Sequence, residues 1–513
     1  MKNKLLEIAE SLEPKLIKEK VQPIRKVKII RDENVFQGWK VKDFGSIEAL
    51  TKISFKTSDS FTIDFGNHQV GYINLSINPL GSHQDAPLRL KLKFGEMPCE
   101  IGESFETYNG WLSKSWLQEE TITIDVLPSN ITLPRRYAFR YLRVDIIATS
   151  RKYNVQFEQI SVTTVSSADI TNVPSLTNTL LDKELIDIDR VSIKTLHDCM
   201  QSVFEDGPKR DRRLWIGDLR LQALANYYTF KNYDLVKRCL YFFAALLEKD
   251  GVVGANVFLE PIPEVDDTVL YDYSLFFVSI LYDYYLETKD IYVLVDLWVI
   301  AMLQIKLALQ RVDEKGIVRD DKSWWSFIDW NDSLNKQTPS QGVLIYVMKQ
   351  ARELADILSD EKNLRFLDLN ISFLSQASIK YLYDSDQGFF ISGQENQVSF
   401  ASQVWMILAQ VFDKEENNKL LERLFTTPPK IGMVTPYMYH HLIDALIISD
   451  KKEKALEVIR AYWGQMVKDG ADCFFEIFNP NNEFESPYGS ILINSYCHAW
   501  SCTPTYFIRK YFT

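Results

Sequence analysis

Apolar and polar residues repeat with two different periods along the chain, and the change falls near residue 170. Before it, short runs such as Phe61-Ile63-Phe65 and Leu88-Leu90-Leu92 alternate apolar with polar side chains, and Gly, Pro, Asn and Asp bound these runs. Such alternation is typical of half-buried antiparallel strands. We therefore predict an antiparallel β-sandwich over residues 35–165.

The segment before the sandwich has a different pattern. Met1 to Leu16 mixes Lys and Glu with apolar residues in an amphipathic pattern. A signal peptide would instead show a positive stretch followed by an apolar block. We predict a helical arm over residues 1–34, which ends in a short connection, and we expect it to be part of the mature protein.

Beyond a polar linker at residues 166–178, which contains Pro174 and has no period, apolar residues recur at spacings of three and four. Twelve segments follow this rule: Leu180–Ser202, Leu219–Thr229, Leu235–Leu247, Tyr271–Tyr285, Ile291–Arg311, Gln341–Leu358, Asn363–Tyr383, Ser399–Phe412, Glu415–Phe425, Pro436–Ile448, Lys452–Met466 and Ser490–Lys510. Two concentric rings of six helices would need this number, so we predict an (α/α)6 toroid over residues 179–513. An α-solenoid is the alternative, but we find no repeat of fixed period.

Any ligand site of such a toroid must be built from the loops at one end, because helices fill the middle. Polar and aromatic residues concentrate in four loops, at 205–218, 260–272, 323–332 and 470–488, and His498 follows closely. Indole faces can cover the C–H face of a sugar while carboxylates accept its hydroxyl hydrogens. Trp324, Trp325 and Trp330 could instead pack between helices, and this alternative stays open.

The net charge and the cysteine content narrow the classes of binding partner and cofactor that we expect. A net charge of −11 argues against nucleic acid and against an anionic membrane surface as partners. The six cysteines are scattered, without metal-type spacing or a dense disulfide framework. We therefore expect reduced thiols in a cytoplasmic protein, no metal and no cofactor. The expected partner is a neutral small molecule or glycan, and a homodimer is left open.

Glu205 to Asp218 is the densest run of charge in the chain, and a Pro, two Gly and a Trp interrupt it. Its four carboxylates could be neutralised by its four cations if the loop folds into a cleft, since buried charge persists only when paired. A surface loop of weak salt bridges is the alternative.

This run resembles the signature of the α-L-rhamnosidases of glycoside hydrolase family 78, in which an Asp is followed after three residues by Arg-Asp-Glu and then by a Trp and a Gly-Asp. The matching residues are Asp206, Arg210, Asp211, Trp215, Gly217 and Asp218. Similar segments are Asp64-Phe65-Gly66, Phe327-Ile328-Asp329-Trp330, Phe474-Phe475-Glu476 and Cys497-His498-Ala499-Trp500-Ser501. The resemblance implies an (α/α)6 toroid and hydrolysis of terminal α-L-rhamnosides with inversion. The expected substrate is a small rhamnoside or a rhamnose-containing oligosaccharide.

The resemblance also implies roles for individual residues. Glu476 lies in the segment that bears the family's catalytic base. Arg212 stands where the family has its general acid Glu, and Arg cannot donate a proton. We choose Asp206 as the acid over Asp211, because the neighbouring Glu205 and a closed pocket would raise the pKa of Asp206. Asp211, between two arginines, should stay ionised and hold sugar hydroxyls.

We expect a sugar pocket around the two catalytic carboxyls Asp206 and Glu476. Its substrate-binding residues would be Arg210, Asp211, Trp215, Asp218, Trp324, Trp325, Asp329, Trp330 and His498. His498 could orient the attacking water, or it could simply pack at a helix start. Arg212 would be a partner cation for Asp211 or Glu205 that fixes the loop.

Three other functional classes stay open. A non-catalytic glycan-binding relative would keep the tryptophans and lack a working acid. A toroid glycosidase for another sugar would prefer unsaturated uronides or α-glucosides. A terpenoid cyclase is the least favoured, because its acidic metal motifs are missing.

Overall fold

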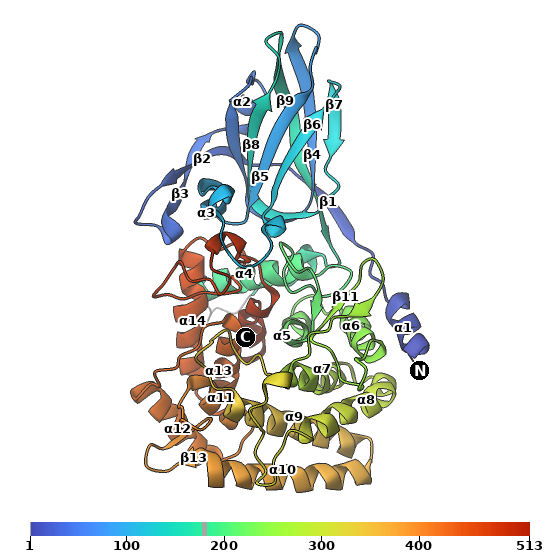
Figure 1. Ribbon diagram of the computed structural model, residues 1–513, viewed down its shortest axis with the longest axis vertical. Helices are drawn as coiled ribbons and strands as arrows, with labels where there is room; N and C mark the ends of the chain where they lie inside the picture. Colours follow the sequence, from blue (N-terminus) through green and yellow to red (C-terminus); the bar gives the residue numbers. More distant parts are fainter. Residues whose placement is uncertain (1, 177–181) are drawn as a thin grey trace.

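The protein is described by a computed structural model over residues 2–176 and 182–513 (Figure 1). A sheet domain, at the top of Figure 1, stands on a ring of helices. The first helix, α1 (Lys2–Ser11), packs against α6 (Tyr233–Ala245) of the ring. Arg238 of α6 donates a hydrogen bond of 2.5 Å to the carbonyl of Ala9, so the helical arm is attached to the outside of the ring.

The sheet domain contains nine strands, and all their pairings are antiparallel. The strands are β1 (Ile17–Val21), β2 (Arg25–Arg31), β3 (Trp39–Gly45), β4 (Ser60–Gly81), β5 (Leu88–Gly95), β6 (Glu119–Ile124), β7 (Ser129–Thr132), β8 (Tyr137–Ala148) and β9 (Tyr153–Ser166). Their main order is β1-β9-β4-β8-β5-β6, while β2 pairs with β3 and β4, and β7 pairs with β4. The expected antiparallel β domain is therefore present, hydrogen-bonded as one continuous sheet.

The long strand β4 explains this continuity. Its first part pairs with β2 and β8, and its second part pairs with β7 and β9. The register shifts between Asp64 and Gln69, where Gly66 takes a φ of 87°. Ile63, Ile73 and Leu75 on β4 are buried in the core of this domain, as strand alternation predicts.

The prediction of a helical arm with a short connection over residues 1–34 was wrong in extent. The helix ends at Ser11, and β1 and β2 already belong to the sheet. β1 reads Ile-Lys-Glu-Lys-Val and is exposed along almost all its length, because it is an edge strand beside β9. An exposed edge strand has no apolar face to alternate, so its pattern gives no strand signal.

Twelve helices of the described chain form the ring. They are α4 (Lys183–Cys199), α5 (Ile216–Tyr227), α6, α7 (Tyr271–Thr288), α8 (Ile291–Leu309), α9 (Gln337–Ile357), α10 (Glu361–Leu382), α11 (Phe400–Leu408), α12 (Lys414–Thr426), α13 (Pro436–Ile448), α14 (Lys452–Lys468) and α15 (Pro504–Tyr511). The odd-numbered helices α5 to α13 pack each on the next, and α15 packs on α5 and α4 to complete the circle. The predicted toroid is confirmed.

Burial separates the two layers of helices. Every residue of α5 is buried, whereas α10 buries five of its 22 residues. A helix that is apolar all round belongs inside, and an amphipathic helix belongs outside. α8 is the one helix in the described part of the chain that is long and apolar enough to cross a bilayer, and 56% of its apolar window is buried in the ring.

Two predicted boundaries differ from the structure. The segment Ser490–Lys510 forms two short 3₁₀ turns, Ile491–Ile493 and Ala499–Ser501, before α15 begins at Pro504. Proline suits a helix start because it lacks a backbone N–H. In the predicted linker, β9 ends at Ser166 and a 3₁₀ turn spans Ile170–Asn172. The end of the linker and the predicted start of the first helix fall on residues 177–181, outside the described residues.

Candidate active site

A cavity of about 180 Å³ lies among the loops that lead into α5, α7, α9 and α15. It is lined by Asp206, Arg210, Asp211, Trp215, Asp218, Thr268, Leu270, Tyr273, Trp325, Phe327, Trp330, Glu476, Tyr488, His498 and Trp500. Nine of the eleven residues predicted for the site are among them. The cavity is smaller than the roughly 300–1,000 Å³ usual for drug-sized ligands, which suits a single sugar ring.

Residues 205–218, called here the signature loop, are held by their own backbone and by the C-terminal segment. The N–H of Asp206 donates to the carbonyl of Arg213, and the carbonyl of Asp206 accepts from the N–H of Ala499 at 2.7 Å. Asp211 and Arg212 both have left-handed backbones, with φ of 58° and 56°. Such conformations are uncommon for residues other than glycine and occur often at functional sites.

The end of this loop needs a glycine. A Cβ on Gly217 would lie 2.3 Å from the ring of Tyr273, so a larger residue would push the start of α5 away from α7. Asp218 follows directly, in the first turn of α5. The close approach therefore fixes where the Asp218 carboxyl enters the cavity.

Glu476 is buried and held at both oxygens. Oε1 accepts a 2.5 Å hydrogen bond from the hydroxyl of Tyr488, and Oε2 accepts from the Arg210 guanidinium. Burial works to raise the pKa of Glu476, but Arg210, His498 and the Tyr488 hydroxyl outweigh it, and the pKa lies below its usual value. Glu476 is therefore ionised, as a general base must be.

Two other carboxyls of the cavity have pKa values above the usual range. Burial, with the nearby charges of Asp211 and Asp218, raises the pKa of Asp206 well above its usual value. Burial and the charge of Glu476 likewise raise the pKa of Asp218. The expected raised pKa of Asp206 is present, and burial in a closed pocket is its first cause, as predicted. The neighbouring carboxylates, however, are Asp211 and Asp218, whereas Glu205 pairs with Arg136 of the sheet domain at 2.6 Å.

Asp211 differs from Asp206 in position. The Asp211 side chain is 23% exposed, whereas Asp206 is buried, and the Oδ1 atom of Asp206 accepts from the N–H of Arg213 at 3.1 Å. Asp211 therefore lies at the open side of the cavity.

Several buried polar atoms of the cavity residues have no hydrogen-bond partner within the described chain. They include Nε1 of Trp215 and Nε1 of Trp330. Oδ1 of Asp218 and Nδ1 of His498 also make no aligned hydrogen bond, but these two atoms lie 3.4 Å from each other. Burial lowers the pKa of His498 to about 4, so its ring is neutral. Unpaired buried polar groups are costly. The two indole N–H groups are therefore available to donate to hydroxyl groups of a ligand.

Two predicted sugar-binding residues lie outside the cavity. Asp329 accepts hydrogen bonds from the N–H groups of Val434 and Thr435 and from the Thr435 hydroxyl, so its carboxylate fixes the start of α13. Trp324 packs edge-on against Tyr271 at 5.2 Å between ring centres. The alternative of packing between helices is correct for Trp324.

Arg210 and Arg212 of the signature loop form hydrogen bonds with other groups of the protein. Arg210 lines the cavity, but its guanidinium binds Glu476 and the carbonyl of Ile493, the latter at 2.9 Å. Arg212 donates to the carbonyls of Arg136 and Lys209 at 2.8 and 3.3 Å. Arg136 takes the direct ion pair with Glu205, but the charge of Arg212 also works to lower the pKa of Glu205, so Arg212 is a cation close to Glu205, as predicted.

Sequence reasoning missed six lining residues: Thr268, Leu270, Tyr273, Phe327, Tyr488 and Trp500. Five of them lie within the loops and segments that were singled out. Aromatic character was the available signal for Phe327, Tyr488 and Trp500, whereas Thr268 and Leu270 carry none. Tyr273 lies in the first turn of α7, where its pattern is that of an ordinary buried helix residue.

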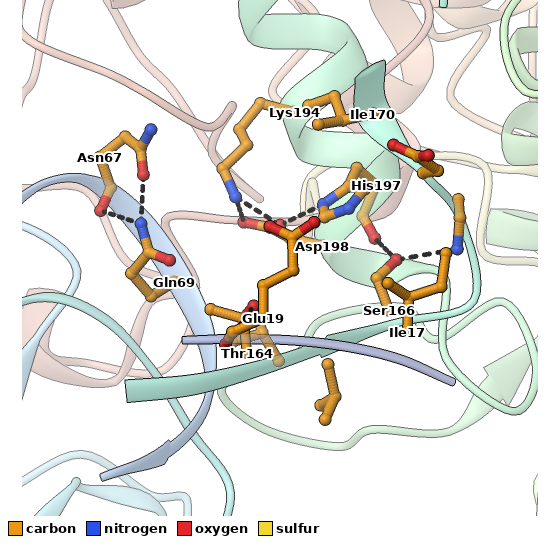
Figure 2. A pocket seen from close by; sticks show the side chains of 14 residues that line it. Ile17, Glu19, Asn67, Gln69, Thr164, Ser166, Ile170, Lys194, His197 and Asp198 are labelled. Atoms are coloured by element: carbon orange, nitrogen blue, oxygen red, sulfur yellow. Dashed lines mark hydrogen bonds and ion pairs between the residues drawn. The ribbon is translucent and has the colours of Figure 1, made fainter. Parts of the chain in front are cut away.

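A second cavity, of about 170 Å³, lies at the junction of the two domains (Figure 2). Figure 2 shows Lys194 and His197 of α4 directed at Asp198, with bonds of 2.6 and 2.8 Å to its Oδ1. The other carboxylate oxygen of Asp198 bonds Nδ1 of His68, whose Nε2 bonds Glu96 at 3.0 Å. None of the predicted site residues lines this second cavity.

Comparison with known proteins agrees with this architecture. The N-terminal domain model of the family 78 glycosyl hydrolase α-rhamnosidases matches residues 23–164. The six-hairpin glycosidase domain model of the bacterial α-L-rhamnosidases matches residues 181–512, well over half of the chain. A comparison with curated protein sequences gives no match.

Solved structures agree as well. A rhamnosidase from Klebsiella oxytoca with rhamnose bound is 48% identical and has a TM-score of 0.97, over 99% of this chain and 98% of that one. A family 78 rhamnosidase from Bacillus sp. GL1 has 20% identity and a TM-score of 0.77, over 92% of this chain but 49% of its own. A Streptomyces avermitilis α-L-rhamnosidase complexed with L-rhamnose has 16% identity and a TM-score of 0.66, over 97% of this chain and 44% of its own. The chain belongs to glycoside hydrolase family 78, the α-L-rhamnosidases.

Proposed function

We propose that this enzyme hydrolyses terminal α-L-rhamnosides with inversion at the anomeric carbon. The observation that carries the proposal is a cavity that holds one ionised carboxylate and two carboxyls of raised pKa beside the unpartnered indole N–H groups of Trp215 and Trp330. The 48% identical Klebsiella oxytoca rhamnosidase, which has rhamnose bound, supports rhamnose as the sugar.

In the proposed mechanism, Glu476 removes a proton from a water molecule that attacks the anomeric carbon. Arg210 and Tyr488 hold its carboxylate in one orientation. A protonated carboxyl then donates to the leaving glycosidic oxygen. Inversion needs a separation of about 6.5–9.5 Å between the two carboxyls, which leaves room for the water.

Asp206 is our candidate for the acid, because its raised pKa keeps it protonated. A specific observation favours Asp211 as the second candidate. Asp211 is the more exposed carboxyl, and the leaving group must exit through the open side of the cavity. The role of His498 follows from its neutral ring, which can accept a hydrogen bond from a sugar hydroxyl or from the attacking water.

Arg212 supports one competing function, a glycan-binding protein without catalysis. A panel of p-nitrophenyl glycosides tests both proposals, since the hydrolase should release nitrophenol from the α-L-rhamnoside alone. Proton NMR during turnover should show β-rhamnose as the first product. Absence of turnover, with rhamnose still bound, would favour the glycan-binding protein. Cytoplasmic location, and no nucleic acid or membrane as partner, stay predictions.

A further inference from the structure

The sheet domain contributes an exposed tryptophan beside the cavity. Trp111 lies in the segment between α3 (Pro98–Gly102) and β6, and its side chain is 68% exposed. Its ring lies 5.6 Å from the ring of Tyr488, measured between centres. Tyr488 lines the cavity and bonds the base Glu476. An exposed indole is therefore one side chain away from the catalytic base.

Trp111 is fixed in place, although it is exposed. Its backbone N–H donates to the carbonyl of Tyr488 at 3.1 Å, and its indole N–H donates to the carbonyl of Pro487 at 2.9 Å. The loop backbone also approaches closely, since a Cβ on Gly110 would lie 2.7 Å from the Tyr488 carbonyl. The one hydrogen bond that the indole makes lies at its edge, so its flat faces are not used for hydrogen bonding.

The rest of this loop is packed onto the ring. Phe105 and Leu117 from the sheet domain form one small apolar core with Tyr488, Leu492 and Ile493 from the ring. Preorganised aromatic groups bind with little loss of conformational entropy. The anchoring of Trp111 is thus of the kind that a binding platform needs.

The cavity has room for one sugar ring, so the leaving group of a rhamnoside must lie outside it. Two large aromatic side chains are exposed next to the cavity, Trp111 from the sheet domain and Trp325, 42% exposed, from the ring. An indole face binds a flat apolar surface, which an aromatic ring or the C–H face of a second sugar can provide.

We propose that Trp111 forms a platform for the leaving group, so that the sheet domain helps select rhamnosides whose aglycone has a flat apolar face. This inference rests on the proposed function, because it takes the rhamnosyl unit to occupy the cavity. Glu476 and Asp206 would then act on the sugar, while Trp111 would bind only what is attached to it.

Trp111→Ala tests the platform, with Trp111→Phe as the conservative variant and Phe44→Ala as the control. Phe44 is a second exposed aromatic residue of the sheet domain, on β3, and it is not among the residues lining the cavity. The substrates are methyl α-L-rhamnoside, phenyl α-L-rhamnoside and the disaccharide 6-O-α-L-rhamnosyl-glucose, called here the glucosyl substrate. We expect Trp111→Ala to lower kcat/KM for the phenyl or glucosyl substrate about threefold to tenfold, as an aromatic contact implies. The methyl rhamnoside and inhibition by free rhamnose should be unchanged, and Phe should restore most of the loss.

The phenyl and glucosyl substrates distinguish an aromatic leaving group from a sugar leaving group. A loss with the phenyl substrate alone indicates an aromatic aglycone, and a loss with both indicates that a sugar is also accepted. Equal losses with all three substrates would mean that Trp111 only supports the fold, and no loss with any would mean that it binds nothing. Either result overturns the proposal.

Binding measurements with an uncleaved analogue test this inference independently of the proposed hydrolysis. Phenyl 1-thio-α-L-rhamnoside resists cleavage, and its Kd can be measured by calorimetry beside that of rhamnose. Trp111→Ala should weaken the thioglycoside about threefold to tenfold and leave rhamnose unchanged. If the wild-type protein cleaves no rhamnoside but this difference holds, the hydrolase proposal fails and the platform stands.

Discussion

The Nζ atom of Lys209 lies 2.6 Å from Oε1 of Glu100, and both side chains are 1% exposed. Lys209 belongs to the signature loop, and Glu100 lies on α3 of the sheet domain. Lys209 also donates to the carbonyl of Asn494 at 2.6 Å. One ammonium group thus joins the sheet domain, the signature loop and the C-terminal segment.

Lys209→Met should destabilise the protein by about 3–5 kcal/mol, because it leaves a buried carboxylate without its cation. Adding Glu100→Gln should recover part of the loss, since the amide oxygen can still accept from the N–H groups of Glu96 and Met97. The control is Lys454→Met, which breaks an exposed 2.7 Å pair with Glu457 and should cost less than about 1 kcal/mol. Urea unfolding measures all three, and equal stability of the two lysine variants would contradict the argument.

Glu476→Gln should lower kcat by about 10²- to 10⁴-fold, as loss of a positioned base implies. Tyr488→Phe keeps the carboxylate but removes the 2.5 Å hydrogen bond that orients it. We expect a smaller loss for this variant, about tenfold to a hundredfold, because a hydrogen bond to a charged group contributes about 1.5–3 kcal/mol. Glu485→Gln is the matched control, since Glu485 bonds Asn479 on the same loop and does not line the cavity. Normal turnover by Glu476→Gln would place the base elsewhere.

Asp206→Asn and Asp211→Asn together identify the acid. Loss of an acid should slow a methyl rhamnoside by about 10²- to 10⁴-fold and p-nitrophenyl rhamnoside far less, because nitrophenolate leaves without protonation. We expect this dependence on the leaving group for Asp206→Asn. If Asp211→Asn shows it instead, the more exposed carboxyl is the acid. In the wild type, kcat/KM should fall below the lowered pKa of Glu476 and again above the raised pKa of the carboxyl set.

Arg212→Glu restores the residue that the family uses as its acid, yet we expect no faster turnover. The change removes the hydrogen bonds from Arg212 to the carbonyls of Arg136 and Lys209 and adds a carboxylate near Glu205. The Tm should therefore fall. Arg212→Asn is the control, because Asn tolerates the left-handed backbone better than most residues and adds no charge. Higher rates of Arg212→Glu on both methyl and p-nitrophenyl rhamnosides would overturn the assignment of Asp206.

His68 should make the stability depend on pH. Burial works to lower its pKa, but Cys473, Asp198 and Glu96 outweigh it, and the folded-state pKa lies well above 6.5. A raised folded pKa means that the stabilisation is complete below about pH 6.5 and is lost as the pH rises through the folded value. His68→Gln should unfold more easily at pH 6 and lose less stability between pH 6 and pH 9 than the wild type. Parallel curves for the two proteins would show that His68 is not the group responsible.

The sequence pattern predicted most of the helices well, because apolar residues recur along them at spacings of three and four. It failed for β1, whose exposed edge position removes that alternation. Trp325 and Trp330, predicted from the concentration of aromatic residues in their loop, line the cavity, as does Trp215, predicted from the family resemblance, but Asp329 does not. An aspartate among tryptophans has the same local pattern whether it holds a sugar or the N–H groups of Val434 and Thr435. Only the tertiary structure brings these residues, more than 100 positions apart, together.

The order in which the chain is synthesised determines when the signature loop can meet the residues that hold it. The loop is made when less than half of the chain has left the ribosome, yet the carbonyls of Ile493 and Asn494 and the N–H of Ala499 that fix it come near the end. Domains fold as they emerge, from the N-terminus onward. The sheet domain can thus be complete early and can supply Glu100 and Arg136 as partners of the loop, whereas Arg210 must wait for Glu476 and the carbonyl of Ile493. A ribosome-bound chain lacking that segment would be inactive and exposed to proteases at this loop.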